Sequence, residues 1–245
     1  MKKLNAGVIG YGKWGKIFVK QLNKVAKIKF ILNSSDKLPN KLVNIDWIFI
    51  LSSNKTHEKF VSLILKKKIN VFCEKPLTES FSTSQKLLKL SQKNKVKLYV
   101  DNIEKFKNKI IRLNKNNFIK RGKYFRKKQS FKEILFKLFY HDAYLLYDSI
   151  KAKKIKQIKI IKTDNQLNVD INYSKFQLNF IYSLKEKKSY HQINNVNLRK
   201  YNGNPLLKMI TKVLNNQCNY IENRNSALFA NSLIEKLLNS KYFKR

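Results

Sequence analysis

Glycine, proline and cysteine are all scarce in this chain of 245 residues. Of its six glycines, four fall within the first fifteen positions. The two cysteines, Cys73 and Cys218, lie in different halves of the chain without the spacing of a metal site. We expect no disulfide between them in a reducing compartment, and we interpret both as small buried apolar residues.

Long apolar runs are also absent. A run such as Trp47–Leu51 is far too short to cross a bilayer. Glycine and lysine interrupt the stretch after Lys2 and Lys3 before the core of a signal peptide could form. With 43% hydrophobic and 12% aromatic residues, the composition predicts a globular cytoplasmic protein without a membrane partner. The length suffices for two modest domains.

Acidic residues are few: 15 Asp and Glu stand against 53 Lys and Arg, which gives a net charge of +38. Such a charge is typical of proteins that bind nucleic acid or anionic surfaces. The alternative is compositional drift in an AT-rich genome, because Lys, Asn and Ile are abundant everywhere while Arg, Gly, Pro and Ala are rare. The lysines are spread evenly, and arginine, the preferred base-reading residue, is scarce. We therefore favour drift and expect no nucleic-acid partner despite the basic charge.

The glycines that are present form a motif near the N-terminus. The apolar pair Val8–Ile9 leads into Gly10-x-Gly12-x-x-Gly15, and a helix-like pattern follows. This order of strand, glycine turn and helix is the context of a dinucleotide-binding turn. Gly10 permits the tight bend, Gly12 lets the backbone approach a diphosphate, and Gly15 lets helix and strand pack closely. The predicted helix carries apolar residues on one face: Trp14, Ile17, Phe18 and Leu22.

A second strand is expected over residues 27–32. In an NAD-selective site an acid usually closes this strand and binds the ribose hydroxyls. Here no acid stands at the expected place, and the chain continues with Asn33 and Ser34. Either of these could hold a ribose, and Lys37 could meet a 2′-phosphate, so the choice between NAD and NADP stays open.

The next strand, over residues 45–51, begins only about ten residues later. A full crossover with its own helix and strand needs more chain than that, so one unit of the usual doubly wound sheet is predicted to be missing or reduced to a loop. After this strand come Ser52 and an amphipathic helix that Asn54 or Thr56 can cap. These residues also stand where ligands bind in such sheets. For His57 we favour a first-turn surface position, with a cofactor contact as the alternative.

A short strand, residues 70–73, ends in Glu74-Lys75-Pro76. The glycine turn, the strand ending near Ser-Asn-x-x-His and this Glu-Lys-Pro element together resemble the Gfo/Idh/MocA oxidoreductases. Members of that family oxidise or reduce sugars, inositols and related polyols with NAD(P). The resemblance is close over residues 3 to about 102 and holds in outline beyond, which suggests a shortened, divergent member.

The resemblance implies that Lys75 lies beside the nicotinamide and the substrate hydroxyl, where an ammonium can hold the oxygen that becomes a carbonyl. It also implies a cis bond before Pro76, as in relatives. The alternative is a solvated lysine before a turn-forming proline. No metal is expected. The residues expected to contact NAD or NADP are Gly10, Tyr11, Gly12, Lys13, Trp14, Gly15, Asn33, Ser34, Ser52, Asn54, His57 and Glu74.

A helix is predicted over residues 131–150, and the resemblance implies that His141 on it contacts the substrate and acts as acid or base. Relatives commonly carry an Asp four residues earlier, on the same helix face. Here Lys137 stands at that position, and its charge would lower the pKa of His141. Asp142 lies on another face. Either His141 works with Lys75 alone, or the redox chemistry is altered or lost; a packing role is the further alternative.

Beyond residue 150 the apolar period changes to two. Residues 167–173 and 176–182 alternate as strands of an antiparallel meander with one face toward a core, after a turn at 163–166. In relatives the other face of such a sheet meets an oligomer partner. The aromatic residues are expected to be core or interface rather than a base-stacking platform. His191 has no neighbour in sequence that suggests chemistry. Helices follow from Pro205 and around Ala230.

Together these patterns predict an α/β protein: a reduced Rossmann-type domain over residues 1–103, then an α+β substrate-binding and oligomerisation domain with a mainly antiparallel sheet over residues 104–245. The function expected is an NAD(P)-dependent oxidoreductase acting on a hydroxyl or keto carbon of a sugar, sugar nucleotide or polyol. The alternative is a non-catalytic, regulatory member that binds a nucleotide or sugar. A nucleic-acid binder ranks third.

Overall fold

The computed structural model describes residues 3–33, 35–39, 41–240 and 243–244. The chain forms two compact units. One comprises residues 1–106 and 204–228, and the other comprises residues 107–203 and 229–245. No helix in the described part of the chain is both long and apolar enough to span a membrane.

The first unit is built on a parallel sheet of five described strands in the order β2-β1-β3-β4-β5. The topology reverses at β1, as in a doubly wound sheet, so the predicted Rossmann-type architecture is confirmed. The strand bounds are β1 Leu4–Ile9, β2 Ala26–Leu32, β3 Trp47–Ile50, β4 Asn70–Cys73 and β5 Leu98–Val100.

The predicted loss of one crossover is confirmed as well. Strand β2 lies at the edge of the sheet, and the described residues between β2 and β3 form neither a helix nor a strand. The segment from residue 33 to residue 46 is too short for the further helix and strand of a complete β-α-β unit.

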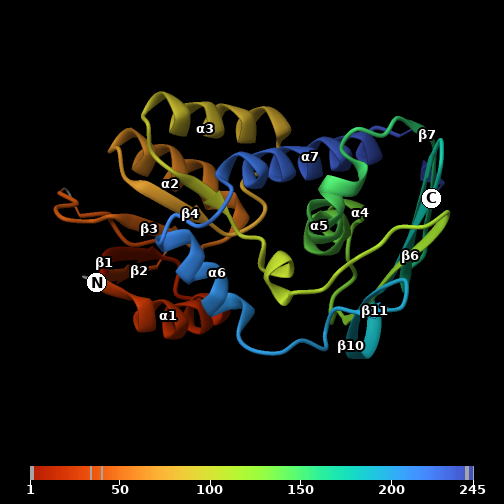
Figure 1. The fold of residues 1–245 in the computed structure, drawn as a ribbon, viewed down its shortest axis with the longest axis horizontal. Coiled ribbons are helices and arrows are strands. Elements are labelled where there is room, and N and C mark those ends of the chain that lie inside the picture. The colour runs from red at the N-terminus through yellow and green to blue at the C-terminus, as the bar shows by residue number, and fades with distance from the viewer. Residues whose placement is uncertain (1–2, 34, 40, 241–242, 245) are drawn as a thin grey trace. The chain divides into compact units, whose positions relative to one another are not determined.

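Helices cover both faces of this sheet: α1 (Lys13–Val25) lies on one side, and α2 (Asn54–Lys66) and α3 (Phe81–Lys93) lie on the other (Figure 1). Under α1, the Phe18 ring packs 5.5 Å from Phe49 and 5.0 Å from Phe72, measured between ring centroids. The expectation that Ile17 shares this buried face is wrong, because its side chain is 46% exposed. A short 3-10 helix, η1 (Ile103–Lys107), follows β5.

The helix α6 (Pro205–Leu214) also belongs to the first unit, although it lies about a hundred residues further along the chain. Its Asn204 cap accepts the Leu207 N–H, and Pro205 occupies the first turn as predicted. The helix packs against α1 and completes the core on that side of the sheet. The single cut predicted between residues 103 and 104 places α6 in the second domain, whereas the division into units places it in the first. Its core side chains are Leu206, Met209, Ile210, Val213 and Leu214.

The second unit contains a mixed sheet in the order β11-β10-β6-β9-β8-β7-β12. Its described strand pairs are antiparallel except β6 with β9 and β12 with β7, which accords with the mainly antiparallel sheet predicted. The strands are β6 Asn116–Tyr124, β7 Ile155–Lys162, β8 Gln166–Tyr173, β9 Gln177–Ser183, β10 Lys185–Ile193, β11 Val196–Asn197 and β12 Phe243–Lys244.

The period-two pattern of β8 and β9 places alternate apolar side chains in the core, Val169 and Phe180 among them. The predicted helix over residues 131–150 is one continuous stretch of three parts: α4 (Phe131–Ile134), a π-helical turn η2 (Leu135–Phe139) and α5 (Tyr140–Ile150). The last helix, α7 (Tyr220–Leu238), contributes residues to both units.

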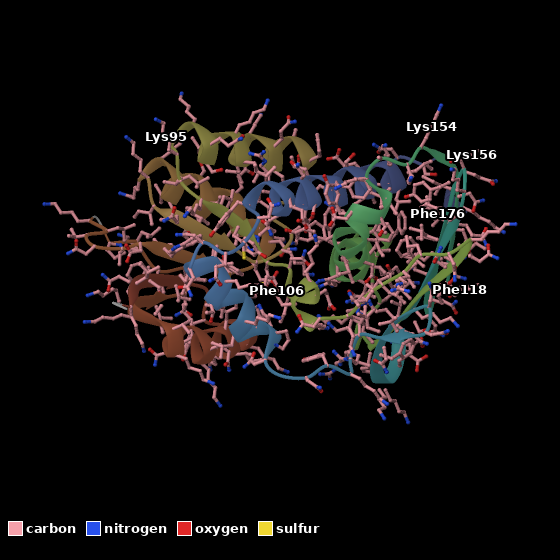
Figure 2. The ribbon with its side chains drawn as sticks, in the orientation of Figure 1. Lys95, Phe106, Phe118, Lys154, Lys156 and Phe176 are labelled. Carbon is pink, nitrogen blue, oxygen red and sulfur yellow. The ribbon has the colours of Figure 1, made fainter. Side chains whose placement is uncertain are left out.

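Lysine side chains project outward around the ribbon, as the labelled Lys95, Lys154 and Lys156 illustrate (Figure 2). All three are exposed. The charge of +38 is therefore carried largely by a solvated surface, in line with the expectation drawn from the even spread of lysine.

Candidate functional site

The glycine turn joins β1 to α1 with almost no room for side chains. Gly10 has a φ of +107°, which disfavours any residue with a Cβ, and its N–H donates to the Leu32 carbonyl over 2.7 Å. A Cβ at Gly10 would lie 2.3 Å from the Ser52 nitrogen, and one at Gly15 would lie 2.2 Å from the Gly10 carbonyl oxygen. These two glycines are therefore required for the strand-to-helix packing itself.

Gly12 differs from its neighbours because a Cβ there would meet no atom within 4 Å. It forms the N-cap of α1 without a side-chain cap, and the first turn of the helix carries no acid. The backbone N–H groups of that turn thus face open space, with the positive end of the helix dipole behind them. This cradle fits the diphosphate of a dinucleotide, as predicted from the motif.

The other residues predicted in this turn lie around its rim. Tyr11 is 39% exposed, and the Lys16 ammonium lies 5.7 Å from the centre of its ring. Trp14 is half-buried and packs edge-on against Phe18, with ring centroids 6.4 Å apart. Lys13 is exposed at the first position of the helix, where its charge is available to an anion.

At the end of β2, the structure adds an acid that the sequence pattern did not single out. The Asp36 carboxylate turns back and accepts the Asn33 N–H over 2.7 Å, while the Asp36 N–H donates to the Asn33 carbonyl over 3.2 Å. Asp36 thus reaches the end of the strand where a ribose-binding acid is usually found. An Asx-type turn is the signal that could have revealed it. Ser34, the other predicted ribose contact, lies outside the described residues.

The loop after β3 does not cap α2 in the way predicted. Ser53 rather than Asn54 or Thr56 occupies the N-cap, and no side chain accepts a cap hydrogen bond. Asn54 instead begins the helix, and the Thr56 hydroxyl donates to the Ser53 carbonyl while lying 2.7 Å from the Ser52 hydroxyl. Ser52 and Asn54 remain partly exposed.

His57 is fully buried, so the favoured surface position is wrong. Its Nδ1 lies 2.8 Å from the Pro76 carbonyl oxygen, and its Nε2 lies 3.1 Å from the Ser52 carbonyl oxygen. The ring therefore joins the loops that follow β3 and β4. Burial lowers the pKa of His57, against the opposing effect of the two carbonyls.

The Glu74-Lys75-Pro76 turn lies at the carboxyl edge of the same sheet. The Glu74 N–H donates to the Ile50 carbonyl over 2.9 Å, which ties the turn to β3, and the bond before Pro76 is cis as predicted. Gly10, Ser52 and Glu74 thus follow the ends of the three adjacent strands β1, β3 and β4. The sheet brings together the predicted glycine, serine and Glu-Lys-Pro elements.

One more acid joins this edge from β5. Asp101 follows the strand and is 2% exposed; its N–H donates to the Cys73 carbonyl over 2.8 Å. Burial raises the pKa of both Glu74 and Asp101, and the Asp101 charge adds to this for Glu74, whereas the Lys75 charge lowers both. No sequence pattern had singled out Asp101, because a lone acid after a strand carries no signature.

His141 lies in the second unit, half-buried near the start of α5. A π-helical turn, η2 (Leu135–Phe139), precedes it, and Lys137 lies within that turn. Lys137 donates to Glu133 over 3.1 Å and to Gln129. Its charge is thus partly balanced by a carboxylate on the preceding turn.

Asp142 is fully buried and turns into the sheet. It accepts the Tyr182 hydroxyl over 2.8 Å, and its Oδ1 lies 2.8 Å from Nε2 of His191 and 3.9 Å from Nε of Arg121. Burial opposes ionisation here, but the Arg121 and His191 charges outweigh it and lower the pKa of Asp142. The expectation that His191 has no chemical neighbour is therefore wrong. Arg121 was missed because an inward-facing arginine interrupts the apolar pattern of β6.

This network anchors the helix that carries His141 to three strands, through Arg121 of β6, Tyr182 of β9 and His191 of β10. Arg121 also donates to the Leu138 carbonyl over 3.2 Å, at the π-helical turn. Within the described residues, no three His, Cys, Asp or Glu side chains come together as a metal site.

Comparisons with known proteins agree with this geometry. Residues 16–102 match the model of an oxidoreductase family with an NAD-binding Rossmann fold. The chain is 27% identical over 117 residues to a myo-inositol 2-dehydrogenase from Thermotoga maritima, over 39% of this chain and 35% of that protein. The alignment thus spans about a third of the length of that relative.

Solved structures match over nearly the whole chain. A UDP-N-acetylglucosamine 3-dehydrogenase from Acidithiobacillus ferrooxidans has a TM-score of 0.82 at 11% identity, covering 96% of each chain. A dehydrogenase from Thermus thermophilus, in complex with NAD and UDP-GlcNAcA, has a TM-score of 0.74 at 12% identity, covering 99% of this chain and 97% of that one. At such identities the likeness shows the fold, and within the first unit residues 16–102 match an NAD-binding Rossmann family.

Proposed function

We propose that the chain is a Gfo/Idh/MocA oxidoreductase, because residues 16–102 match that family's model, and that it is an NAD(P)-dependent dehydrogenase or reductase acting on a CH–OH group. The observation that carries the proposal is the position of Lys75. It stands in the turn after β4, at the same sheet edge as the glycine cradle that fits a diphosphate. Cofactor-binding and proton-handling groups therefore share one edge.

The chain's own residues have separate tasks in this proposal. The backbone N–H groups at the start of α1 hold the diphosphate, and Asn33 with Asp36 forms the rim for the ribose. A bound nicotinamide supplies the hydride acceptor or donor. Lys75 holds the substrate oxygen and takes its proton on oxidation, or returns it on reduction. We assign His141 as a second substrate contact on the anchored helix α5.

The substrate class is a sugar, sugar nucleotide or polyol. It is supported by the names of the similar proteins, which act on myo-inositol and UDP-N-acetylglucosamine. The exposed lysines produce a positive electrostatic potential that attracts an anionic sugar nucleotide. A cytoplasmic location and a homo-oligomer through the outer face of the second sheet remain predictions.

The second candidate is a non-catalytic member that binds a nucleotide or sugar and regulates. One observation favours it. Asp142, the acid next to His141 in sequence, binds Tyr182 and His191 near Arg121. It is therefore not available to pair with His141 in catalysis. In this candidate the glycine cradle keeps its task, and Lys75 binds without transferring a proton.

Titration separates the two candidates. We expect NADH or NADPH to bind the wild-type protein and to be consumed or formed with a member of a sugar, polyol and sugar-nucleotide panel. Lys75→Met removes the amine, so it should lower turnover by at least about a hundredfold, as for loss of a general acid or base, while the cofactor still binds. The matched control is Lys89→Ala, at an exposed position on α3, which should change neither the turnover nor the affinity for the cofactor.

The outcomes divide cleanly. Binding without turnover across the panel supports the regulatory candidate. Absence of binding for both dinucleotides, measured by cofactor fluorescence with the folded protein, contradicts both candidates.

A further inference from the structure

Strands β4 and β5 end side by side with an acid just beyond each end. The register pairs Cys73 with Val100, so Glu74 and Asp101 are the next residues along two adjacent parallel strands. The Asp101 N–H donates to the Cys73 carbonyl over 2.8 Å, which holds the two strand ends together. Two carboxyl groups therefore flank Lys75 at the edge where the glycine cradle lies.

Only one of the two carboxylate oxygens of Asp101 accepts a hydrogen bond among the described atoms. Its Oδ1 accepts the Ile103 N–H over 3.0 Å, whereas its Oδ2 has no hydrogen-bond partner among the described atoms, although the residue is 2% exposed. A buried carboxylate oxygen without a donor is costly unless the group carries a proton or faces a cation. Both ways of stabilising the Asp101 carboxylate are available here: it can share a proton with Glu74, and Lys75 supplies a positive charge.

We propose that Asp101 is a positioning residue that acts through Lys75: with Glu74 it forms a carboxyl pair that shares one proton and sets the charge state of the Lys75 amine. One proton on the pair leaves a single negative charge, which matches the single positive charge of Lys75. Two carboxylates at the ends of neighbouring strands repel each other, so they do not both ionise easily. The role of the pair in catalysis rests on the proposed dehydrogenase function. Its effect on the charge of Lys75 does not depend on that function.

Other ionisable groups surround the pair on every packed element. They are Cys73 on β4, Tyr99 on β5 and Glu104 on η1, together with His57 on α2, whose pKa the Lys75 charge lowers. The negative charges of Glu74 and Asp101 raise the pKa of Cys73, in addition to burial. Cys73 and Tyr99 therefore stay neutral near pH 7, which leaves the two carboxyls and Glu104 as the groups whose ionisation balances Lys75.

In the resting site Lys75 is an ammonium, so it first passes a proton to the carboxyl pair, whose charge changes from −1 to 0. The resulting Lys75 amine then takes the hydroxyl proton from the substrate oxygen, while a bound nicotinamide would accept the hydride with its electron pair. The pair finally releases its proton to water, which restores its charge of −1. Reduction runs through the same positions in reverse. A proton store beside Lys75 gives this site a relay that lies entirely in the first unit.

The test measures the protonation state of the Lys75 amine directly and needs no cofactor. Competitive acetylation of the folded protein, read by peptide mass spectrometry, follows the fraction of Lys75 amine across the pH range. In Asp101→Asn, which keeps an acceptor for the Ile103 N–H, we expect Lys75 to react at least about threefold faster at pH 9, because a nearby negative charge that stabilises its ammonium is gone. The effect should shrink toward pH 6, where the wild-type pair is itself protonated.

Two further variants complete the test. Glu74→Gln should also make Lys75 react faster, because it removes the other negative charge that stabilises the Lys75 ammonium. Asp46→Asn alters an exposed acid at the opposite, amino end of the sheet, where Asp46 accepts the Asn5 N–H, and should leave Lys75 unchanged.

Thermal unfolding provides the second readout. A carboxyl with a raised pKa in the folded state loses its stabilising effect as the pH rises through that value. The Tm of Asp101→Asn relative to wild type should therefore increase from pH 5 to pH 9. Equal Lys75 reactivity in wild type and Asp101→Asn at every pH, together with a Tm difference that does not vary with pH, would overturn the proposal. Neither readout depends on turnover, so this result stands apart from success or failure of the proposed dehydrogenase.

Discussion

At the scale of single residues, His57 illustrates how a buried polar group joins two loops of the candidate site. Both ring nitrogens face carbonyl oxygens, yet a neutral imidazole has only one N–H to donate. Protonation would satisfy both carbonyls, but burial lowers the pKa of His57 and favours the neutral form. The ring thus ties together the Ser52 loop and the Lys75–Pro76 turn at some electrostatic cost.

Replacing His57 with leucine should destabilise the first unit. The change removes the single ring N–H, so one of the Pro76 and Ser52 carbonyls loses its donor, at a cost of about 1–3 kcal/mol. Urea unfolding at pH 7.5 measures the loss. Glu58→Leu, at an exposed position on the same helix, is the control and should stay within about 0.5 kcal/mol of wild type.

The same residue predicts a pH dependence with a definite sign. Because the pKa of His57 is lowered on folding, the unfolded chain binds a proton that the folded chain resists. Stability supplied by the neutral ring is present above the ordinary pKa of histidine, near 6.5, and is lost as the pH falls below it. The loss of Tm between pH 7.5 and 5.5 should be smaller in His57→Leu than in wild type. Parallel pH profiles for the two proteins would contradict this assignment.

At the scale of elements, the β1–α1 turn needs glycine for two different reasons. Gly10 and Gly15 are required by contacts inside the protein, whereas Gly12 borders open space at the helix N-terminus. The sequence motif treats all three alike. Only the surroundings of each Cα position distinguish a glycine needed for folding from one needed for ligand approach.

This distinction predicts different outcomes for two small substitutions. Gly12→Ala should fold with nearly wild-type Tm but weaken NADH and NADPH binding by about tenfold or more, because the methyl group occupies the space of the diphosphate. Gly15→Ala should lower the stability by about 1–3 kcal/mol, since its Cβ overlaps the Gly10 carbonyl. Differential scanning fluorimetry and cofactor titration measure the two effects. A Gly12→Ala protein that binds both cofactors as tightly as wild type would argue against the diphosphate site.

At the scale of the whole molecule, the chain returns to complete its first unit. Helix α6 buries five apolar side chains against α1 and the sheet, so the nucleotide-binding unit is not contiguous in sequence. Exposing these side chains would cost roughly 10 kcal/mol at about 2 kcal/mol each. That is comparable with the total stability of a domain.

Residues 1–106 alone should therefore fail to unfold cooperatively. A second chain, in which residues 1–106 are joined to residues 204–228 by a flexible Gly/Ser linker of about twenty residues, should recover a cooperative transition and the aromatic near-UV signal. Circular dichroism during heating compares the two. A sharp transition in residues 1–106 alone would show that α6 is dispensable.

Much of the fold and part of the site followed from local sequence signals. The glycine turn, the strand lengths, the missing crossover and the Glu-Lys-Pro turn each depend on residues close together in the chain, where backbone geometry restricts the choices. The alternation in β8 and β9 likewise reports a sheet with one buried face. The sequence thus determined that the protein has a reduced Rossmann-type domain with a lysine in a turn at the carboxyl edge of its sheet.

The tertiary structure decided what depends on partners far apart in the chain. It placed His57 between Ser52 and Pro76, and brought Asp101 beside Glu74. It also gave Asp142 its partners Arg121, Tyr182 and His191. Such groups carry no local pattern, because their burial and charge are set by strands and helices that meet only after folding. A side chain's pKa and task follow from that environment rather than from its neighbours in sequence.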